Sequence, residues 1–528
     1  MSFRVFIPTA GTGSRLGRLT SNINKSLISV ANRPVLSHQI DKFSDKCEFV
    51  IALGYKGSLV REFLSISYPD HRFLFVDIHP FQGSGSGLGF TLLCCKKYLQ
   101  EPFVFLSCDT LVVEEVPSPK QNWVGCAESE DISAYRTLCI NDKGVVQSIH
   151  EKGASDANSH LAYIGLAGIN NCTEFWNSMD QGLEASREEG EAYGLRSLLD
   201  NDSLLAHTFT WFDTGTPEAL SRAKCAYSLP GAPNILEKSN EFIWFIDSRV
   251  IKFCDDRDFI ANRVRRAQIL KAFIPKMLAS SNHMYSYERV EGRTFSQVAT
   301  LPLFKRLLRH CAGFWETSHL DQYQLCRFHD RCYRFYHDKT KKRLLEFYQT
   351  FDKQDGSQPI NDVHMPTMTD LLSLVDWDSL SNGMAGRFHG DFHFENILWD
   401  QQIEKFIFLD WRQDFGDDLI VGDIYYDLAK LLHGLIVSHD VVTKGAFSII
   451  WSENAIHYEL YRKQSLVECE RYFSEWCRQN QFDYARVKIL AALIFVNIAC
   501  LHHYPYSLLL YALGKHLLAT SLEENAAD

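Results

Sequence analysis

The sequence predicts two domains: an N-terminal α/β domain with a doubly wound, Rossmann-like sheet, and a C-terminal α+β domain with a largely helical second lobe. Three observations support this fold class. The chain has 528 residues, more than one ordinary hydrophobic core holds. Over residues 1–226, short apolar runs alternate with longer amphipathic stretches, which is typical of parallel strands joined by helices. Beyond residue 240 the helical period dominates.

The first domain is expected to cover residues 1–227. Its predicted strands are short apolar runs bounded by glycine, proline, serine or aspartate, namely Arg4–Pro8, Glu48–Leu53, Arg72–Asp77 and Phe103–Ser107. Residues 228–240 contain Pro230, Gly231 and Pro233 and are the predicted linker. The second domain is then expected to span residues 241–528.

The second domain is predicted to open with a β-hairpin of Phe242–Ile246 and Val250–Phe253. Two further short strands are expected at Ile397–Trp399 and Phe406–Leu409. Asp352–Pro366 is predicted to be a surface loop, and the chain from about Gly422 to be mostly helical. The most apolar stretch, Ile489–Cys500, falls short of the ~20 residues that span a bilayer, so we expect a buried helix there.

Composition excludes several classes of protein. Hydrophobic residues make up 46% and charged residues 23%, and the formal charge of −11 is spread along the chain, which argues against nucleic acid as the main partner. The N-terminus lacks the layout of a signal peptide, and the fifteen cysteines show no CxxC spacing. We therefore expect a cytoplasmic protein of the size of an enzyme, with reduced thiols and no membrane insertion. The sequence leaves monomer and homo-oligomer open.

A glycine-rich turn follows the first predicted strand. Its residues are Ala10, Gly11, Thr12 and Gly13, and such a strand-to-helix turn lets backbone N–H groups approach phosphates. A plain tight turn would also explain the glycines, and the spacing fits neither a dinucleotide fingerprint nor a P-loop. Two cations, Arg15 and Lys25, follow at a distance that lets them converge on one polyphosphate. The turn is therefore a candidate nucleotide site.

With these residues the first 226 positions resemble the sugar-nucleotide pyrophosphorylases, which open with a GxGxRL loop followed by a lysine. The resemblance implies that Arg15 and Lys25 stabilise the triphosphate and the attacking phosphate. Asn24 stands where the family usually has proline. Two further segments match the family: Asp109 at the end of a predicted strand, and Asp213 within a segment resembling WxDTGTPE. By the resemblance both aspartates are ligands of Mg²⁺, which prefers carboxylate and phosphate oxygens.

The same resemblance implies two further contacts. Gln82 and Gly83 would touch the base, and Glu151 and Lys152 would touch the acceptor. The glycines of Gly83–Gly89 are equally compatible with a mobile loop. For Asp213 a helix-capping role before Pro217 also remains open.

A second site is predicted at His389-Gly390-Asp391-Phe392-His393-Phe394-Glu395-Asn396, which has the HxDxxxxN spacing of a kinase catalytic loop. In such loops the aspartate accepts the proton of an attacking hydroxyl, and the asparagine reaches a Mg²⁺ ion. After two predicted strands comes Asp410, in the place of the second metal-binding aspartate. The histidines nearby are expected to be structural, because Mg²⁺ prefers oxygen ligands.

Residues 235–520 resemble the aminoglycoside phosphotransferases and choline/ethanolamine kinases, which share a protein-kinase-like fold. The likeness rests on this loop, on Leu409-Asp410-Trp411 and on Gly422–Ala429. It implies that Lys252 contacts ATP phosphates and that Glu288 and Val290 lie in the hinge that holds adenine. No glycine-rich loop precedes Lys252, and residues 261–276 contain no acidic residue to pair with it. An exposed strand lysine without function is the alternative for Lys252.

Together the two resemblances imply a bifunctional enzyme with consecutive steps. ATP would phosphorylate a small sugar, polyol or amino alcohol. The product would then condense with an NTP to give an activated precursor and pyrophosphate. CTP is slightly favoured over UTP as this NTP. Surface polysaccharide or lipid decoration is the pathway expected by analogy. Two alternatives stay open: a pyrophosphorylase with a degenerate kinase domain as scaffold, and a nucleotide-sensing protein without turnover.

Overall fold

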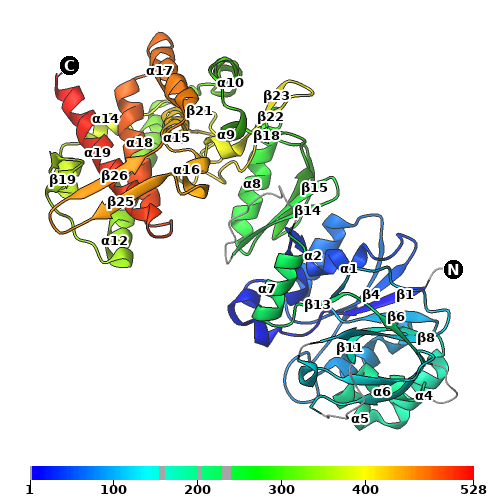
Figure 1. Cartoon of the computed structure of the whole chain (residues 1–528). Coiled ribbons are helices and arrows are strands. Elements are labelled where there is room, and N and C mark those ends of the chain that lie inside the picture. The colour runs from blue at the N-terminus through cyan, green and yellow to red at the C-terminus, as the bar shows by residue number, and fades with distance from the viewer. Residues whose placement is uncertain (1–2, 130, 154–160, 200–203, 229–239, 528) are drawn as a thin grey trace. The chain divides into compact units, whose positions relative to one another are not determined.

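The computed structural model describes residues 3–129, 131–153, 161–199, 204–228 and 240–527. Contacts within the chain define two compact units, which Figure 1 traces from the N- to the C-terminus. Unit 1 comprises Met1–Ile260 and Met277–Arg289, and unit 2 comprises Ala261–Lys276 and Val290–Asp528. Most of the predicted linker, residues 229–239, lies outside the described residues.

The centre of unit 1 is a parallel sheet made of the four predicted strands. β1 (Arg4–Pro8), β4 (Glu48–Leu53) and β5 (Arg72–Asp77) have the predicted bounds, and β6 (Phe103–Leu106) ends one residue early. β1 pairs with both β4 and β6, and β4 pairs with β5, all in parallel. The side chains of β1, β4 and β6 are almost all buried, as expected for strands covered on both faces. The predicted α/β fold is confirmed.

The sheet continues beyond β6 through β11 (Leu161–Ile169), which pairs antiparallel to β6. The strand order is β10-β9-β11-β6-β1-β4-β5, with β8 paired to β11 and β12 paired to β8. The other strands are β2 (Ser29–Val30), β3 (Arg33–Pro34), β7 (Thr110–Val112), β8 (Asn122–Glu128), β9 (Thr137–Ile140), β10 (Val146–His150), β12 (Leu204–Thr208) and β13 (Trp211–Asp213). The helices are η1 (Ser14–Thr20), η2 (Lys25–Leu27), α1 (Val35–Ile40), α2 (Gly57–Ser67), α3 (Leu88–Cys95), η3 (Lys96–Tyr98), η4 (Ile132–Ala134), α4 (Cys172–Gln181), α5 (Leu183–Glu189), α6 (Glu191–Arg196) and α7 (Pro217–Ala226).

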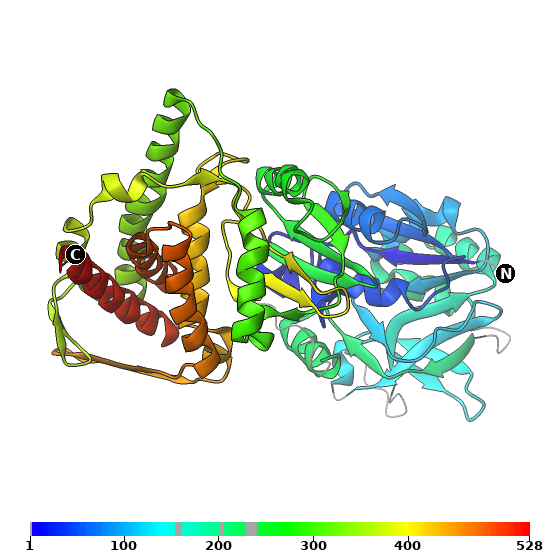
Figure 2. The ribbon, with the colours of Figure 1, turned by 90° about the horizontal axis from the view of Figure 1, so that it is seen from above.

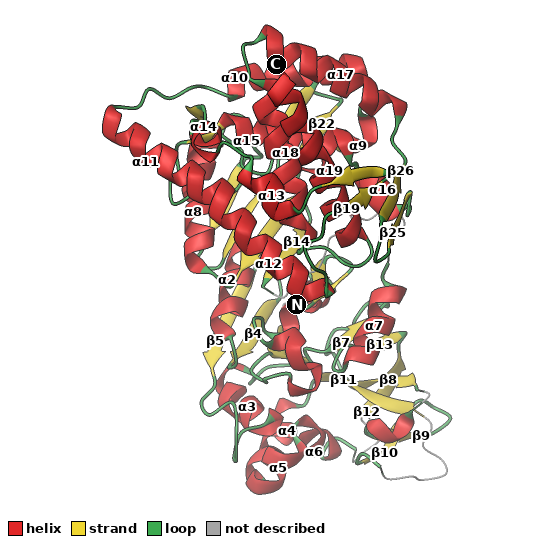
Figure 3. Cartoon of the chain, turned by 90° about the vertical axis from the view of Figure 1, so that its left-hand side faces the viewer, coloured by secondary structure: helices red, strands yellow, loops and turns green. Residues whose placement is uncertain are grey.

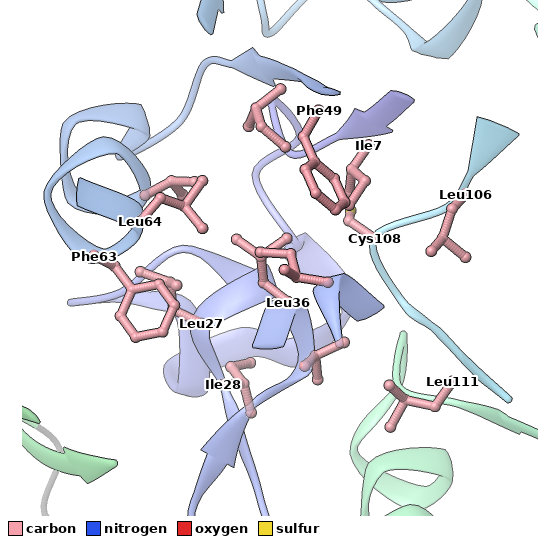
Figure 4. Packing of buried hydrophobic residues seen from close by; sticks show 14 of the residues in the cluster. Ile7, Leu27, Ile28, Leu36, Phe49, Phe63, Leu64, Leu106, Cys108 and Leu111 are labelled. Atoms are coloured by element: carbon pink, nitrogen blue, oxygen red, sulfur yellow. The ribbon is translucent and has the colours of Figure 1, made fainter. Parts of the chain in front are cut away.

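One hydrophobic core lies on the face of the sheet that carries α1 and α2. Figure 4 shows Ile7 and Phe49, from the sheet, packed with Leu27, Leu36 and Phe63 from the segments that cover it. All five side chains are fully buried. Burial of a large apolar side chain contributes roughly 1.5–3 kcal/mol, so this core holds the strand ends, and the loops that follow them, in fixed positions.

A second, antiparallel sheet also belongs to unit 1. It has the order β14-β15-β17-β16 and comprises β14 (Glu241–Ile246), β15 (Arg249–Cys254), β16 (Met277–Ser280) and β17 (Met284–Glu288), which confirms the predicted hairpin. Trp244 is fully buried in the core of unit 1, where its ring lies 5.2 Å from that of Phe63 and its Nε1 donates to Ser29 Oγ at 2.9 Å. The hairpin was expected to open a separate domain, yet it completes the core of the first unit.

A fragment ending at Tyr227 is therefore expected to be less stable than one ending at Arg289. The shorter fragment loses Trp244, Ile251 and Phe253, all buried in the shared core. Loss of a single buried aromatic side chain costs about 3–5 kcal/mol, so we expect a difference of at least that order. Urea unfolding of the two purified fragments measures it.

The full-length chain supplies the control for this comparison. Trp244→Ala should lower the urea midpoint, whereas Val113→Ala, at an exposed position of unit 1, should leave it nearly unchanged. Equal stability of the two fragments would contradict a shared core and would favour independent domains that separate at residues 228–240.

Unit 2 is dominated by helices, which Figure 3 shows in red. They are α8 (Arg257–Leu270), which begins in unit 1, α9 (Phe295–Val298), α10 (Leu301–Phe314), α11 (Gln322–Tyr333), the π-helix η6 (Arg334–Asp338), α12 (Lys339–Phe351), α13 (Met368–Ser373), α14 (Trp377–Ser381), the 3-10 helix η7 (Phe394–Asn396), α15 (Ile424–Ile436), α16 (His439–Thr443), α17 (Gln464–Gln479), α18 (Tyr484–Ala499) and α19 (Tyr506–Ala527). Figure 2 shows α18, in orange, beside α19, in dark red, and the two make many contacts. The predicted buried helix at Ile489–Cys500 is confirmed as most of α18.

The strands of unit 2 form short ribbons. They are β18 (Arg293–Thr294), β19 (Gln358–Ile360), β20 (Val363–Met365), β21 (Ala385–Gly386), β22 (Ile397–Asp400), β23 (Lys405–Phe408), β24 (Gly422–Asp423), β25 (Phe447–Trp451) and β26 (Ile456–Leu460). β22 and β23 confirm the two predicted strands. This unit has the expected α+β class with a largely helical part.

Two predictions about unit 2 need correction. Asp352–Pro366 is not only loop, because β19 and β20 form a hairpin there. Its turn residues Asn361 and Asp362 have φ values of 48° and 65°, the left-handed conformation that two-residue hairpin turns require and that Asn and Asp tolerate. The chain after Gly422 also contains the β25–β26 hairpin in addition to its helices.

All fifteen cysteines are free thiols, and most are buried, as the sequence predicted. Desolvation raises the pKa of buried thiols such as Cys95, to about 12, which keeps them protonated and unreactive. Among the described residues, no helix combines the length and apolarity needed to cross a membrane.

Candidate active sites

A cavity of about 400 Å³ opens in unit 1 at the carboxyl ends of β1 and β6. This is the edge where α/β sheets bind ligands. Its lining includes seven predicted residues, Ala10, Gly11, Thr12, Lys25, Gln82, Gly83 and Asp109. The other lining residues, which were not among the predicted site residues, are Pro8, Phe81, Ser86, Gly87, Leu88, Thr91, Ser107 and Cys108. The volume is within the range of small-molecule sites.

Gly13 ends the glycine-rich turn in the left-handed conformation, with φ of 67°. A Cβ at this position would lie 3.0 Å from both Lys25 Cβ and Thr20 Cγ2. Glycine is therefore required both for the backbone conformation and for the close approach of Lys25. The turn and the lysine are parts of one packed arrangement.

Lys25 and Asp109 form an ion pair in the cavity wall, with Nζ 3.1 Å from Oδ2. Ser107 Oγ donates to the other oxygen of Asp109 at 2.6 Å. Burial alone would raise the pKa of Asp109, but Lys25 and the hydrogen bonds outweigh it and lower the pKa to about 2. Burial alone would lower the pKa of Lys25, yet attraction to Asp109 raises it above its ordinary value. Both groups are charged at neutral pH.

Asn24, which replaces the usual proline, fixes the segment before Lys25. Its side chain is fully buried and donates to the carbonyls of Thr9, at 2.9 Å, and Tyr55, at 2.6 Å. Its Oδ1 accepts from the backbone N–H and the hydroxyl of Ser26. The amide thus ties Lys25 to the end of β1 by hydrogen bonds, which explains why asparagine is tolerated there.

A two-stranded ribbon places Asp213 beside Asp109. β13 pairs antiparallel with β7, which places Asp213 opposite Thr110. A Cβ built at Gly215 would lie 3.1 Å from an oxygen of Asp213 and 3.5 Å from one of Asp109. Burial and the charge of Asp109 raise the pKa of Asp213. Two neighbouring carboxylates with this mutual repulsion are a suitable pair of ligands for a divalent cation.

Asp213 has a further partner that the sequence analysis missed, since Tyr135 donates its hydroxyl to Oδ2 at 3.0 Å. Arg15 lies exposed in η1, outside the residues that line the cavity. Glu151 and Lys152 do not line it either. Glu151 instead pairs with Arg136, at 3.0 Å, and with Arg196, at 2.5 Å. The structure thus groups Lys25 with both aspartates, but not with Arg15.

In unit 2 the predicted catalytic loop brings Asp391 and Asn396 together. Asn396 Nδ2 donates to the backbone oxygen of Asp391 at 2.9 Å and to its Oδ2 at 3.2 Å. The other carboxylate oxygen, Oδ1, lies 2.8 Å from Nζ of Lys430 on α15. Burial opposes ionisation of Asp391, but Lys430 and His393 hold its pKa well below the usual range. Asp391 is therefore a carboxylate, and Lys430 is a partner that the motif did not reveal.

His389 and Asp427 hold the backbone of this loop. Burial lowers the pKa of His389 to about 3, so its ring is neutral. Its Nε2 lies 2.8 Å from the carbonyl of Leu409, and its Nδ1 accepts from the backbone N–H of Asp391, which defines the tautomer. Asp427 accepts from the backbone N–H groups of His389, at 2.6 Å, and Gly390, at 2.7 Å. Both residues are structural supports, as expected for the histidine.

Asp427→Ala is expected to destabilise unit 2. The substitution leaves the N–H groups of His389 and Gly390, and the indole N–H of Trp315, without their buried acceptor. Because each such loss costs about 1–3 kcal/mol, we expect a total on the order of 3 kcal/mol or more, read as a lower urea midpoint. Asp330→Ala, at an exposed position of α11, is the matched control and should have almost no effect.

Asp410 follows β23 in a left-handed conformation, with φ of 57°, unusual for a residue other than glycine. Its Oδ1 lies 3.5 Å from Nη1 of Arg263 on α8. One turn further along α8, the buried Arg266 donates to the carbonyls of Phe388, His389, Arg412 and Leu419. Residues 261–276 contain no acidic residue, and the arginines of α8 instead hold Asp410 and the loop that carries Asp391.

The predicted ATP contacts Lys252 and Glu288 lie in unit 1, and Val290 begins the second segment of unit 2. Lys252 is buried within β15, opposite Tyr285 of β17, and is therefore not the exposed strand lysine of the alternative interpretation. Glu288 ends β17 and is exposed. The hairpin before Lys252 turns at Asp247 and Ser248, in place of a glycine-rich loop.

Residues 248–447 match the phosphotransferase enzyme family. The N-terminal part is similar to nucleotidyltransferases. A low-salt glycan biosynthesis nucleotidyltransferase of Haloferax volcanii is 27% identical over 231 residues, which cover 41% of this chain and 63% of the relative. The chain thus spans less than two thirds of that relative. A UTP–glucose-1-phosphate uridylyltransferase of the same organism is 26% identical over 30% of this chain and 68% of its own length.

Among solved structures, a CTP:phosphocholine cytidylyltransferase from Streptococcus pneumoniae has 17% identity and a TM-score of 0.36, and the match covers 43% of this chain and 100% of that chain. The family match and the relatives confirm both resemblances seen in the sequence, and both concern enzymes. The chain joins a part like the sugar-nucleotide nucleotidyltransferases to a phosphotransferase-like part.

Proposed function

We propose that this chain is a bifunctional enzyme that phosphorylates a small hydroxyl compound with ATP and then condenses the resulting phosphate with an NTP. The observation that carries the proposal is the presence of two separately built constellations. Lys25, Asp109 and Asp213 gather at the cavity of unit 1, and Asp391 and Asn396 gather in the loop of unit 2. Phosphoryl and nucleotidyl transfer both depend on positioning and charge neutralisation.

In the transferase reaction, an oxygen of the phosphorylated acceptor attacks the α-phosphorus of the NTP and pyrophosphate leaves. The cavity supports binding of the nucleotide, with the turn at Ala10–Gly13 offering backbone N–H groups and Lys25 offering a fixed positive charge. Lys25 is pre-oriented by Asp109 and Asn24, so it needs no reorganisation as negative charge develops on the phosphate oxygens. Arg15, exposed on η1, would approach the triphosphate only from outside this cavity.

In the phosphotransferase reaction, the acceptor hydroxyl attacks the γ-phosphorus of ATP and ADP leaves. Asp391 orients the hydroxyl and takes its proton at a carboxylate oxygen. The hydrogen bond from Asn396 and the ion pair with Lys430 keep Asp391 ionised and in place. Lys252, Glu288 and Val290 are proposed ATP contacts, on the resemblance alone.

Both sites suit a divalent cation, and we propose Mg²⁺. Asp109 and Asp213 present oxygen atoms beside the cavity, and Asn396 and Asp410 offer an amide and a carboxylate oxygen in unit 2. Mg²⁺ in nucleotide sites takes one or two carboxylates plus phosphate oxygens, which fits both sets. When bound, the ion neutralises phosphate charge. Glu151 and Lys152 are proposed acceptor contacts only if the network of Glu151 with Arg136 and Arg196 opens.

The substrates are proposed on chemical grounds. A relative named for glycan biosynthesis supports an activated precursor for surface polysaccharide or lipid decoration. We slightly favour CTP over UTP as the nucleotide substrate, because the products of choline-type kinases are commonly the substrates of cytidylyltransferases. A scaffold role for unit 2 is the second candidate, and the tight turn at Asp247 and Ser248 in place of a glycine-rich loop is the observation that favours it.

Two separate assays test the proposal on the full-length protein with Mg²⁺. Pyrophosphate release is measured with CTP, UTP, GTP or dTTP and a panel of hexose 1-phosphates and phosphocholine. ADP formation is measured with ATP and the corresponding alcohols and sugars. We expect both products. Release of pyrophosphate without formation of ADP from any acceptor would favour the scaffold candidate. The absence of both products would contradict the proposal.

Removal of divalent cations is expected to abolish both activities. Without a cation, Asp109 and Asp213 repel the triphosphate instead of binding it, and the ATP phosphates face Asp410 directly. Excess EDTA should reduce both rates to background, and added Mg²⁺ should restore them. Activity of either half in EDTA would rule out the metal role of its aspartates.

A further inference from the structure

The neighbourhood of Asp391 in unit 2 is unusually rich in cations. Lys430 Nζ lies 2.8 Å from Asp391 Oδ1. Lys339 Nζ lies 4.2 Å from the centre of the Phe335 ring, and Arg412 Cζ lies 4.8 Å from the same centre. We call Lys339, Arg412 and Lys430 the acceptor-side cations. They come from α12, from the segment after Asp410, and from α15, so that three elements far apart in sequence bring positive charge to one place.

Arg412 is anchored beside the catalytic loop by its backbone. Its N–H donates to the carbonyl of His389 at 2.9 Å, and a Cβ built on Gly390 would lie only 2.6 Å from Arg412 Cβ. Gly390 has φ of 88°, so both its conformation and this contact require glycine. The residue directly before Asp391 is therefore packed against Arg412.

Lys339 and Arg412 both lie against the ring of Phe335. Burial, followed by the charges of Arg412 and Lys430, lowers the pKa of Lys339 well below its usual value. Lys339 is the first residue of α12, directly after the π-helix η6, and π-helical turns are frequent at functional sites. The backbone irregularity and the cation cluster thus coincide.

The nearby carboxylates do not neutralise Lys339 and Arg412. Asp391 pairs with Lys430, Asp410 faces Arg263, Glu346 pairs with Arg343, and Asp427 accepts from the loop backbone. Within the described part of the chain, neither Lys339 nor Arg412 has a carboxylate oxygen within 4.0 Å, and Arg412 Nε is buried without a hydrogen-bond partner. Holding cations together in this way is costly unless an anion binds between them.

The two oxygens of Asp391 separate the cluster from the proposed metal side. Oδ2 accepts from Asn396, a proposed metal ligand, whereas Oδ1 faces Lys430. Of the acceptor-side cations, Lys430 therefore lies at the oxygen of Asp391 that does not contact Asn396. A hydroxyl compound that approaches Asp391 from this direction meets positive charge. A choline-like or aminoglycoside-like cation would be repelled there.

We propose that the acceptor of the phosphotransferase is an anion, a hydroxyl compound that also carries a carboxylate or phosphate group, and that Lys339 and Arg412 bind this group. The inference rests on the proposed phosphotransferase activity. It narrows the acceptor class, because cationic amino alcohols and neutral polyols lack the group that the cluster would hold. Arginine and lysine bind carboxylate and phosphate oxygens through charge-assisted hydrogen bonds.

Acceptors matched in skeleton and different in charge test this proposal on the full-length protein. Glycerol is compared with glycerate and glycerol 3-phosphate, glucose with gluconate and glucose 6-phosphate, and ethanolamine and choline serve as cations. We expect ADP formation with a kcat/KM for at least one anion about 10- to 100-fold above its neutral counterpart, the range of one charge-assisted contact. Comparison of the carboxylates (glycerate and gluconate) with the phosphates (glycerol 3-phosphate and glucose 6-phosphate) shows which of the two anionic groups is bound.

Variants then link the preference to the cluster. Lys339→Met should raise the KM for the preferred anion about 10- to 100-fold while the KM for ATP stays nearly constant, and Lys339→Arg should retain most of the activity. Lys341→Met, at an exposed position of the same helix, is the matched control. A raised KM for ATP instead would assign these cations to the nucleotide.

The failures can be told apart. ADP formation that is best with a neutral or cationic acceptor, or is unchanged by Lys339→Met, would overturn the anion proposal and leave the phosphotransferase intact. Absence of ADP with every acceptor would overturn the phosphotransferase activity and, with it, this inference.

Discussion

Asp391→Asn is expected to abolish phosphate transfer by unit 2 while ATP still binds. Asparagine keeps the shape of the side chain but cannot take the proton of the acceptor hydroxyl. It also ends the ion pair with Lys430. Loss of a general base lowers turnover by about 10²–10⁴-fold. ADP formation with the best acceptor measures the effect, and titration with a fluorescent ATP analogue shows whether the nucleotide is retained.

The transferase provides an internal control for this variant, because its residues lie in unit 1. Pyrophosphate release from a supplied phosphorylated acceptor should continue at the wild-type rate. Asp417→Asn is a matched substitution at an exposed position with a φ of 73°, which asparagine tolerates, and should leave both activities unchanged. Normal ADP formation by Asp391→Asn would remove Asp391 from the reaction.

Lys25→Ala is expected to cause the second large loss, a decrease of pyrophosphate release by about 10²–10³-fold, the usual effect of removing one fixed group that stabilises charge in the transition state. The variant also leaves Asp109 in the cavity wall without its cation, which adds negative charge where the triphosphate must bind. Initial rates with the preferred NTP and acceptor measure both kcat and KM.

Lys46→Ala, at an exposed position of unit 1, is the control for this variant, and ADP formation by unit 2 reports on overall integrity. We expect Lys46→Ala to release pyrophosphate at the wild-type rate, and we expect Lys25→Ala to form ADP at the wild-type rate. If Lys25→Ala condensed the NTP at an undiminished rate, the cavity of unit 1 would not be a nucleotidyltransferase site. If ADP formation fell in parallel, a general folding defect would explain the loss.

Local sequence signals were sufficient for the central parallel strands of unit 1 and for the loops at their ends. The runs at β1, β4 and β5 have the observed bounds because each is a short apolar segment flanked by residues that end strands. The hairpin at Asn361 and Asp362 was not predicted because its strands are only three residues long, too short to show an alternating pattern. The two turn residues are the main sequence signal for such a short hairpin.

The candidate sites were predictable only where a motif carried them. Asp391 and Asn396 stand five positions apart in one loop, so their hydrogen bond follows from the motif. Lys430 and Lys339 belong to helices elsewhere in the sequence, and no short-range pattern joins them to Asp391. Arg15 was grouped with Lys25 from proximity along the chain, yet it lies exposed outside the cavity.

By itself, the sequence determined two enzyme-like halves, the glycine-rich turn and the loop that holds Asp391 and Asn396, because strand period, glycine turns and motif spacing are local properties. Only the tertiary structure decided the rest. The β7–β13 ribbon brings Asp213 to Asp109, although they are separated by about a hundred residues. Burial of Trp244 assigns the second sheet to unit 1. The cations around Asp391 meet through the packing of three distant segments. Such contacts depend on which faces of the helices and sheets pack against one another. Many different sequences allow the same packing, so the local sequence pattern does not specify these contacts.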